Sequence, residues 1–286
     1  MKLNKFDNIV VLGSGTIAAQ CIKQLRETVG GEVHVFEKKQ SNSSILEKRL
    51  STMSGIYYSE IGLDIEHRIL QISPKIIFSI NNIYIFSESL ANSFPILNYH
   101  NSLLPKHPGR NAEAWTIFSQ DRVTGVTWHF VDGHVDTGNI ALQREIPLSA
   151  DITSIQLLSV QTKVAYRMFE EILDCLCKGG ELPCKKQEKR ENIKFHFSWE
   201  KPNHGELDLS WDIPRMYAFL RAMDYGKLAM LGVPKLTYQD RSFTWQRYSL
   251  AHTAEESDIQ SDLTRQELHI SRGGNTIRLA GLQICE

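Results

Sequence analysis

Polar side chains crowd the segment N-Y-H-N-S-L-L-P-K-H-P-G, residues 98–109, which directly follows the apolar residues 94–97. Asn98, His100 and Ser102 stand at alternate positions in it. A strand followed by a polar turn would give this pattern, and so would a catalytic loop at the end of a buried strand. The second possibility matters chemically, because an imidazole moves protons near neutral pH and a carboxamide donates hydrogen bonds to a developing oxyanion.

A second polar segment, T-G-V-T-W-H-F-V-D-G-H-V-D-T-G, begins at residue 124. It places His129 on a predicted strand and Asp132 and Asp136 in the loop that follows. Ligands of open α/β sheets bind at the carboxyl ends of strands, so the two segments can bring an imidazole, a carboxamide and a carboxylate into one crevice. A buried Asp136 would keep a histidine charged and oriented. Such a set suits acyl transfer to an amine.

A glycine-rich turn, G-S-G-T at residues 13–16, follows the predicted strand 8–12, and Glu37 ends the next predicted strand, 32–36. This arrangement is typical of a dinucleotide site, in which backbone groups approach a pyrophosphate and the acid holds a ribose hydroxyl. A tight turn from strand to helix also needs glycine. A third alternative is a loop that holds a phosphate or sugar of the substrate itself.

Strand-like and helix-like segments alternate through the first half of the chain, which predicts βαβ units and an α/β fold with a Rossmann-like, mostly parallel sheet. The predicted strands are residues 8–12, 32–36, 75–80, 94–100, 123–131 and 139–148. The predicted helices are a segment that ends near residue 28, then residues 42–54, 61–72, 111–118 and 151–177.

Composition changes at residues 178–192, which are polar and basic, contain Gly-Gly and Pro, and read as a linker. Beyond it we predict a helix and alternating strands that form a small, mostly β, OB-like domain. They cover residues 212–224 for the helix and 242–250, 266–272 and 275–284 for the strands. The expected organisation is therefore a catalytic domain at 1–190 and a C-terminal domain at 191–286.

The bulk composition excludes several classes. The chain has 286 residues, a net charge of −1 and 42% hydrophobic residues, which gives no global attraction to nucleic acid or to an anionic membrane. No apolar run reaches the length of a membrane span, and the first residues lack the pattern of a signal peptide. Five cysteines at spacings that match no common zinc pattern predict neither a disulfide framework nor a metal site. We expect a cytoplasmic protein.

Taken together, the motifs N-x-H-x-S-L-L-P at 98–105 and D-x-x-x-D-T-G-x-I-x-x-Q at 132–143 resemble those of the folate-dependent formyltransferases. That family includes methionyl-tRNA formyltransferase, glycinamide ribonucleotide transformylase and the sugar N-formyltransferases. The resemblance is continuous from about residue 75 to 148. It implies 10-formyltetrahydrofolate as the formyl donor and Asn98, His100 and Asp136 as the catalytic residues.

The resemblance also implies two sets of binding residues. The folate would be contacted by Asn81, Asn82, Ile83, Tyr84, Val131, Asp132 and Val135. The acceptor would be contacted by Gly13, Ser14, Gly15, Thr16, Gly109 and Arg110. In this reading the glycine-rich turn serves the acceptor, because a dinucleotide would compete with the catalytic loop for one crevice.

The acceptor is the least constrained part of the hypothesis. We rank a small-molecule amine first: a nucleotide-linked amino sugar, or an amino-acid-derived intermediate of a secondary-metabolite pathway. Initiator tRNA comes second, since the family's tRNA enzymes carry a long basic insertion where this chain has only E-K-K-Q-S-N-S-S at 37–44, although the basic run at 185–190 keeps tRNA open. Residues 207–236 resemble the start of the C-terminal domain of methionyl-tRNA formyltransferase, a domain that can serve acceptor binding or homodimer formation.

Three further alternatives stay open. Water could replace the amine, which would make the protein a 10-formyltetrahydrofolate hydrolase. Gly13, Gly15 and Glu37 alone would favour an NAD-dependent oxidoreductase. A binding module with a degenerate site is the last alternative, and the intact Asn-His-Asp set speaks against it.

Overall fold

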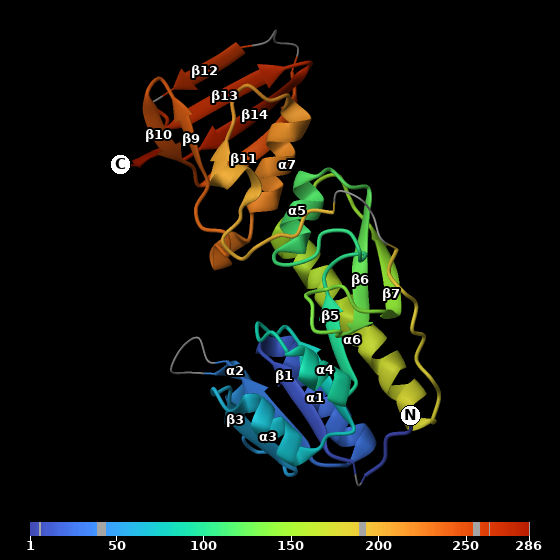
Figure 1. The fold of residues 1–286 in the computed structure, drawn as a ribbon. Coiled ribbons are helices and arrows are strands. Elements are labelled where there is room, and N and C mark those ends of the chain that lie inside the picture. The colour runs from blue at the N-terminus through green and yellow to red at the C-terminus, as the bar shows by residue number, and fades with distance from the viewer. Residues whose placement is uncertain (6, 39–43, 189–192, 254–257, 263, 286) are drawn as a thin grey trace. The chain divides into compact units, whose positions relative to one another are not determined.

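A computed structural model describes residues 1–5, 7–38, 44–188, 193–253, 258–262 and 264–285 (Figure 1). The chain forms two compact units that interleave along the sequence. The first unit comprises Met1–Gly109, Gly125–Ile146 and Val160–Phe195, and the second comprises Arg110–Thr124, Pro147–Ser159 and His196–Glu286.

A seven-stranded sheet with the order β3-β2-β1-β4-β5-β6-β7 is the centre of the first unit. β1 to β5 run parallel, and β6 is antiparallel to β5, so the predicted mostly parallel α/β sheet is confirmed. The strands are β1 (Ile9–Gly13), β2 (Val33–Glu37), β3 (Ile56–Glu60), β4 (Ile76–Ile80), β5 (Ile96–His100), β6 (Val123–Phe130) and β7 (Ile140–Pro147). The helices α1 (Gly15–Val29), α2 (Ile45–Leu50), α3 (Ile65–Ile72), α4 (Glu88–Ser93) and α6 (Ser154–Cys177) connect or follow them.

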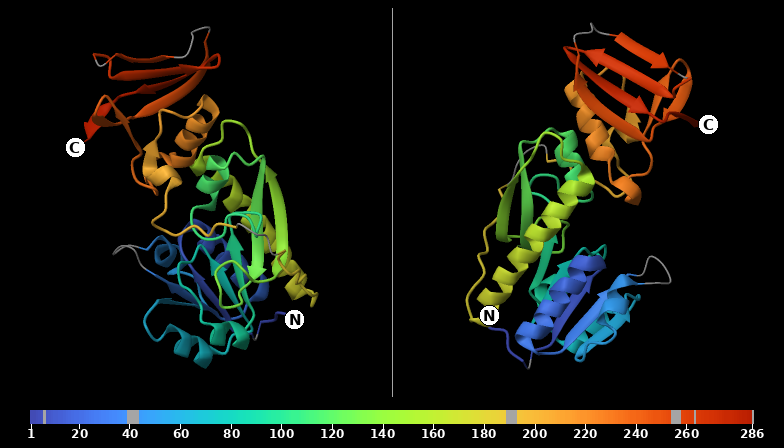
Figure 2. Two further views of the ribbon diagram at one scale, coloured as in Figure 1. Left: turned by 45° about the horizontal axis from the view of Figure 1, so that its top comes forward. Right: turned by 180° about the vertical axis from the view of Figure 1, so that it is seen from behind.

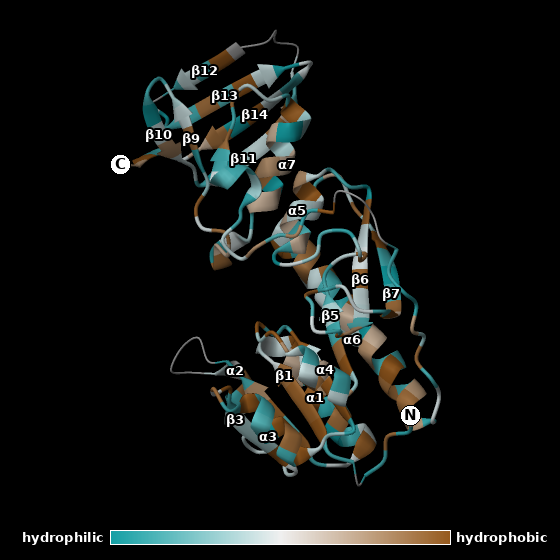
Figure 3. Ribbon diagram, in the orientation of Figure 1, coloured by the Kyte–Doolittle hydropathy of each residue, from teal (hydrophilic) through white to brown (hydrophobic). Residues whose placement is uncertain are grey.

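Helices cover both faces of this sheet, which explains why β1 and β4 are apolar at every position except Ser79 and the closing Gly13. On one face Ile9, Val11 and Phe78 pack with the apolar sides of α1 and α6, which Figure 2 shows from behind. On the other face lie Val10, Leu12 and Ile77, packed with α3 and α4. Figure 3 shows the resulting contrast, with hydrophobic residues along β1 and a mixed pattern along α3.

The strand order reverses between β1 and β4. From β1 the chain adds β2 and β3 on one side of β1, and then β4 and β5 on its other side. Ligands of open α/β sheets bind at such a reversal, outside the carboxyl ends of the strands. Three segments lie at these ends: residues 13–16, which begin with the last residue of β1, residues 81–84 after β4 and residues 101–109 after β5. They are the segments in which the sequence places most of its candidate site residues.

The second unit has its own core. It contains α5 (Ala112–Phe118), α7 (Ile213–Met223) and two four-stranded sheets, in the orders β15-β10-β9-β8 and β11-β14-β13-β12. The strands are β8 (Glu206–Leu207), β9 (Lys235–Tyr238), β10 (Arg241–Thr244), β11 (Arg247–His252), β12 (Asp258–Asp262), β13 (Glu267–Arg272), β14 (Asn275–Ala280) and β15 (Gln283–Cys285). Short 3-10 helices lie at Pro202–Gly205 and Gly226–Leu228. The C-terminal part of the chain is thus mostly β, as predicted.

Several element boundaries differ from the prediction. Residues 242–250 form two strands of different sheets, β10 and β11, and residues 275–284 divide at Gly281, whose φ of 71° ends β14. The first turn of the predicted helix 42–54 falls partly outside the described residues, and α2 ends at Leu50. The division into two domains that are each continuous in sequence, 1–190 and 191–286, stays a prediction. The two compact units described above are a different division of the chain.

Candidate active site

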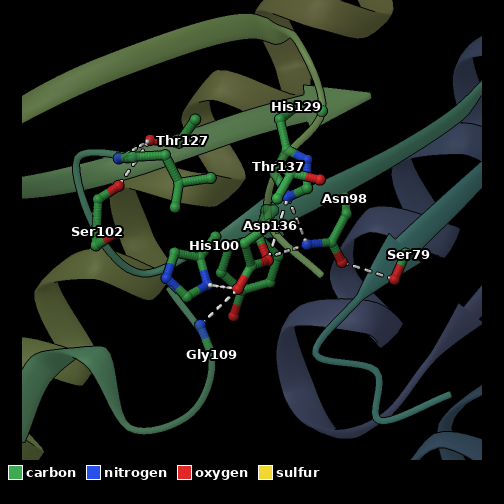
Figure 4. A network of polar contacts seen from close by, with 12 residues as sticks. Ser79, Asn98, His100, Ser102, Gly109, Thr127, His129, Asp136 and Thr137 are labelled. Carbon is green, nitrogen blue, oxygen red and sulfur yellow. Dashed lines mark hydrogen bonds and ion pairs between the residues drawn. The ribbon is translucent and has the colours of Figure 1, made fainter. Parts of the chain in front are cut away.

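β5 positions the first two candidate catalytic residues. Asn98 and His100 lie two residues apart at its carboxyl end, so their side chains point to the same face of the sheet. Asn98 lies directly opposite His129 of the antiparallel strand β6. Facing residues of neighbouring strands project to the same side of the sheet. The pairing of β5 with β6 therefore places the His129 side chain beside Asn98 and His100. Figure 4 shows these side chains around the carboxylate of Asp136.

Asp136 is the buried acid of this cluster, with a side chain only 7% exposed. Its Oδ2 lies 3.4 Å from Nδ1 of His100 and accepts the Gly109 N–H at 2.7 Å, and its Oδ1 lies 3.4 Å from Nε2 of His129. Burial by itself raises the pKa of a carboxyl, but His100, His129 and the Gly109 N–H lower the pKa of Asp136 to about 2. The group is therefore an anion throughout the neutral range.

His100 faces an oxygen with each ring nitrogen. Nδ1 faces Asp136, and Nε2 lies 2.8 Å from the carbonyl oxygen of His107, which can only accept a hydrogen bond. Nε2 therefore carries a proton. Nδ1 faces the Asp136 carboxylate, and the Nε2–H is a donor that an oxyanion can accept in place of the His107 carbonyl.

A chain of hydrogen bonds fixes the direction of the Asn98 amide. The Ser79 hydroxyl donates to Oδ1 of Asn98 at 2.7 Å, so Nδ2 must point the other way, to Nε2 of His129 at 3.0 Å. His129 Nδ1 lies 2.8 Å from the Phe130 carbonyl, and its Nε2 faces both the Asn98 amide nitrogen and the Asp136 carboxylate. The second Nδ2 proton makes only a long contact, 3.3 Å, with the Tyr99 carbonyl. That proton is the one a substrate oxygen can take over.

The loop after β5 is held by buried polar groups. Thr127 donates to the Ser102 carbonyl at 2.7 Å and accepts from the Leu104 N–H at 3.1 Å. Gln143 donates to Thr127 and to the Leu104 carbonyl, at 2.7 and 2.9 Å. Ser102, a polar residue of the opening motif, is fully buried and belongs to this support rather than to the catalytic cluster.

The predicted folate segment after β4 has a fixed conformation. Asn82 accepts the Tyr84 N–H at 3.0 Å and donates to Ser79 at 3.2 Å, so this segment is joined to the Asn98 amide. Tyr84 donates to Glu66 of α3 at 3.0 Å. Ile83 is exposed, which leaves an apolar side chain available to a ligand.

The other predicted folate residues lie on the loop between β6 and β7. Val131 is bound to the sheet through its N–H, which donates to the Ile96 carbonyl at 2.9 Å. Asp132 accepts from Thr137 at 2.7 Å and from the His134 N–H at 3.1 Å, so it stabilises the loop that carries Asp136. Val135 is 37% exposed.

Among the predicted acceptor residues, the glycine-rich turn contacts the folate segment. Ser14 donates to the Asn81 carbonyl at 2.8 Å, and the Asn81 amide donates back to Ser14 Oγ at 3.2 Å. Gly13 lies so close to β4 that a Cβ atom there would meet the Ile80 oxygen at 2.6 Å. Gly15 has a φ of 74°, and Thr16 follows in the first turn of α1. The turn and the segment after β4 therefore form one surface.

The remaining predicted acceptor residues fall in different units. Gly109 belongs to the first unit, where its N–H binds Asp136, and Arg110 belongs to the second, where its N–H donates to the His196 carbonyl at 2.8 Å. Glu37, the acid of the dinucleotide alternative, is buried and accepts hydrogen bonds from Ser44 and, at 2.7 Å, from Tyr58. Its carboxylate is thus already engaged by two hydroxyls of the chain.

Within the described part of the chain, no group of three or more side chains is placed to hold a metal ion, and no helix is long and apolar enough to cross a membrane. The five cysteines are free thiols. Part of the basic run 185–190, Lys189 and Arg190, lies outside the described residues.

The family model described as "Formyl transferase" matches residues 7–173, which include the sheet and all three candidate catalytic residues. The chain belongs to the formyl transferase family. The resemblance inferred from the two motifs is thereby confirmed, and the protein is a formyl-transfer enzyme.

Solved structures of formyl transferases share its fold. An N-formyltransferase from Helicobacter canadensis, solved with folinic acid and dTDP-3-aminofucose, superimposes with a TM-score of 0.75 at 17% identity, over 97% of this chain and 99% of that one. A 4-N formyltransferase from Francisella tularensis gives 0.68 at 17%, over 82% and 94%. Glycinamide ribonucleotide transformylase 1 from Symbiobacterium toebii gives 0.55 at 23%, over 64% and 94%.

Proposed function

We propose that this formyl transferase moves the formyl group of 10-formyltetrahydrofolate to the amine of a nucleotide-linked amino sugar. One observation carries the proposal: the side chains of Asn98, His100 and Asp136 meet at the carboxyl end of β5, beside the strand-order reversal. An amide donor, an imidazole with two acceptors and a buried carboxylate are the groups that formyl transfer to an amine requires.

The reaction can be written with these groups. The acceptor amine attacks the formyl carbon, and the carbonyl oxygen becomes an oxyanion. The free Nδ2 proton of Asn98 and the Nε2 proton of His100 donate to this oxyanion, and they replace the contacts to the Tyr99 and His107 carbonyls. The bond from the formyl carbon to N10 then breaks, N10 takes a proton, and the new amide loses one.

Asp136 has two tasks in this scheme. Its charge stabilises the protonated ring of His100, and through a water molecule it takes the proton that the attacking amine loses. The low pKa of about 2 keeps the carboxylate ionised, which suits the first task.

Two kinds of evidence support the proposed class of acceptor: the geometry of the site and the length of chain that aligns with the Helicobacter enzyme. The Helicobacter enzyme, whose structure contains an amino-sugar nucleotide, aligns over 97% of this chain, so the similarity includes the second unit. A short segment after β2 and a net charge of −1 favour a small acceptor over tRNA, which stays the second candidate. Homodimer formation through the second unit and a cytoplasmic location complete the proposal.

Release of tetrahydrofolate from 10-formyltetrahydrofolate tests the proposal. The protein is mixed with the donor and with one of three pools: amino-sugar nucleotides, diamino acids, or charged initiator tRNA. We expect turnover only with the first pool. Turnover without any amine would instead establish a hydrolase, and turnover only with tRNA would establish the second candidate.

A binding measurement separates the enzyme classes. A stable folate analogue at about 100 times its Kd should stabilise the protein by about 2.7 kcal/mol, whereas NAD should leave the melting temperature unchanged. His100→Ala should bind the analogue and lose most turnover, while His67→Ala, on the exposed surface of α3, should keep both. Stabilisation by NAD alone would revive the oxidoreductase alternative.

A further inference from the structure

The segment after α6 has the composition of a linker, but it is hydrogen-bonded to the first unit. Lys185 exchanges two backbone hydrogen bonds with Ile140 at the start of β7, with N–O distances of 2.7 and 2.9 Å. The Asn139 amide donates to the Cys184 sulfur at 3.3 Å. We call residues 183–187 the strap. It lies against the residues that directly follow the Asp136 loop.

Gln187 ends the strap and reaches into the Asp136 loop. Its side-chain nitrogen donates to the Asp136 carbonyl at 2.9 Å and to the Gly138 carbonyl at 2.7 Å, so both amide protons are used. Gly138 is buried and packs against β6 so tightly that a Cβ atom there would meet the Phe130 oxygen at 1.8 Å. The loop is therefore held by Gln187 from one side and by β6 from the other.

Asp136 needs such support because its backbone is left-handed, with a φ of 59°. Residues other than glycine adopt this conformation rarely. In it the carboxylate accepts the Gly109 N–H and faces His100 and His129. A return of the backbone to a right-handed or extended conformation would turn the carboxylate away from all three groups.

We infer that Gln187 is a positioning residue for the formyl transfer reaction: its amide clamps the two carbonyls of the Asp136 loop and so holds the carboxylate against the two histidines. The inference goes beyond the proposed function and depends on it only for the activity readout. Gln187 donates to backbone carbonyls of the loop and so acts through the position of Asp136.

Three substitutions test the clamp. Gln187→Met keeps the length of the side chain and removes both donors. Gln187→Lys keeps N–H donors at a similar reach, and Lys186→Met changes the exposed neighbour in the strap as a matched control. We expect kcat to fall about tenfold to 100-fold in Gln187→Met, with KM for the folate donor within about twofold of wild type. Gln187→Lys should restore most of kcat, and Lys186→Met should match wild type.

A second readout does not depend on activity. Titration of the Asp136 carboxyl by NMR should give a pKa of about 2 in the wild-type protein, raised toward the ordinary value of about 3.9 in Gln187→Met. A lowered melting temperature with unchanged kcat and unchanged Asp136 pKa would overturn the inference, because the clamp would then be merely structural. A wild-type protein without formyl transfer would contradict the proposed function, and the Asp136 titration would still decide the inference.

Discussion

Asp136 is the residue on which the catalytic cluster depends, because it contacts both histidines and the Gly109 N–H. Asp136→Asn removes the charge and keeps the shape. We expect kcat to fall at least about 100-fold, the lower end of what a positioned proton-transfer group contributes. Steady-state kinetics with folate donor and acceptor check this, with Asp174→Asn, at an exposed acid of α6, as the control. An Asp136→Asn enzyme within tenfold of wild type would refute the role of the carboxylate.

The same substitution has a pH signature in stability. The folded-state pKa of Asp136, about 2, lies below the value of about 3.9 in an unfolded chain. The carboxylate therefore stabilises the fold above pH about 4, and this contribution is lost as the pH falls toward 2. We expect a free energy of unfolding about 2 kcal/mol larger for wild type than for Asp136→Asn near neutral pH, with a difference that shrinks below pH 4. Urea unfolding at several pH values measures it, and a difference that grows with acidity would contradict the sign.

Ser79 fixes the orientation of the Asn98 side-chain amide. Its hydroxyl donates to Oδ1 of Asn98 and so keeps the amide nitrogen toward His129 and the reaction centre. In Ser79→Ala the amide is free to turn, and we expect kcat to fall about tenfold because the oxyanion donor is present only part of the time. KM should change little.

Two variants separate this effect from a general loss of packing. Ser79→Thr keeps the hydroxyl and should keep most of kcat. Ser271→Ala removes a buried hydroxyl of the second unit, whose partner at 2.7 Å is Thr276, and should leave kcat unchanged. Equal kinetics for Ser79→Ala and wild type would show that His129 alone orients the amide.

At the scale of elements, the turn between β1 and α1 is fixed by its approach to β4. Gly13→Ala would place a Cβ atom 2.6 Å from the Ile80 backbone oxygen, which can retreat only with its strand. We expect a loss of about 3 kcal/mol in the free energy of unfolding. In Gly15→Ala the new Cβ atom would lie 3.6 Å from the Asn81 side-chain nitrogen, which is an ordinary contact. The free energy of unfolding should therefore fall by only about 1 kcal/mol, because of the φ of 74° at this position. Chemical denaturation compares the two, and equal losses would contradict the packing argument.

The sequence predicted most elements of the first unit because continuous apolar runs of five residues are typical of central parallel strands. It missed β3, Ile56–Glu60, which is an edge strand with no fully buried residue and so lacks that signal. Asn98, His100 and Asp136 could be chosen as candidate catalytic residues from their types and spacing in the sequence. Ser79 offered a weaker sign, one polar residue in an apolar strand. Gln187 offered none, because its role comes from a tertiary contact 51 residues away along the chain.

The core of the second unit is built from parts of the chain that lie far apart in the sequence. α5, from the first half of the sequence, packs in the core of the second unit: Phe118 meets Phe219 of α7 with ring centroids 6.2 Å apart, and Arg215 lies 3.6 Å over the Phe118 ring. The buried Tyr225 hydroxyl donates to Glu113 of α5 at 2.6 Å. The second core thus includes residues from 110–124 and 147–159 as well as from 196–286.

Removal of residues 196–286 should therefore expose apolar surface instead of releasing a finished catalytic domain. Trp115, Phe118 and Leu157 are all buried in the second core and would lose its other half. At about 25 cal/mol per Å², three large side chains returned to water amount to several kcal/mol, comparable with the stability of a domain. We expect the 1–195 fragment to bind a hydrophobic dye and to aggregate on heating, whereas a fragment with Trp115→Gln and Phe118→Gln should aggregate less. A 1–195 fragment that melts cooperatively within a few degrees of the full chain would show that the first unit suffices, and the boundary near residue 190 would then describe the folding units better than the interleaved division.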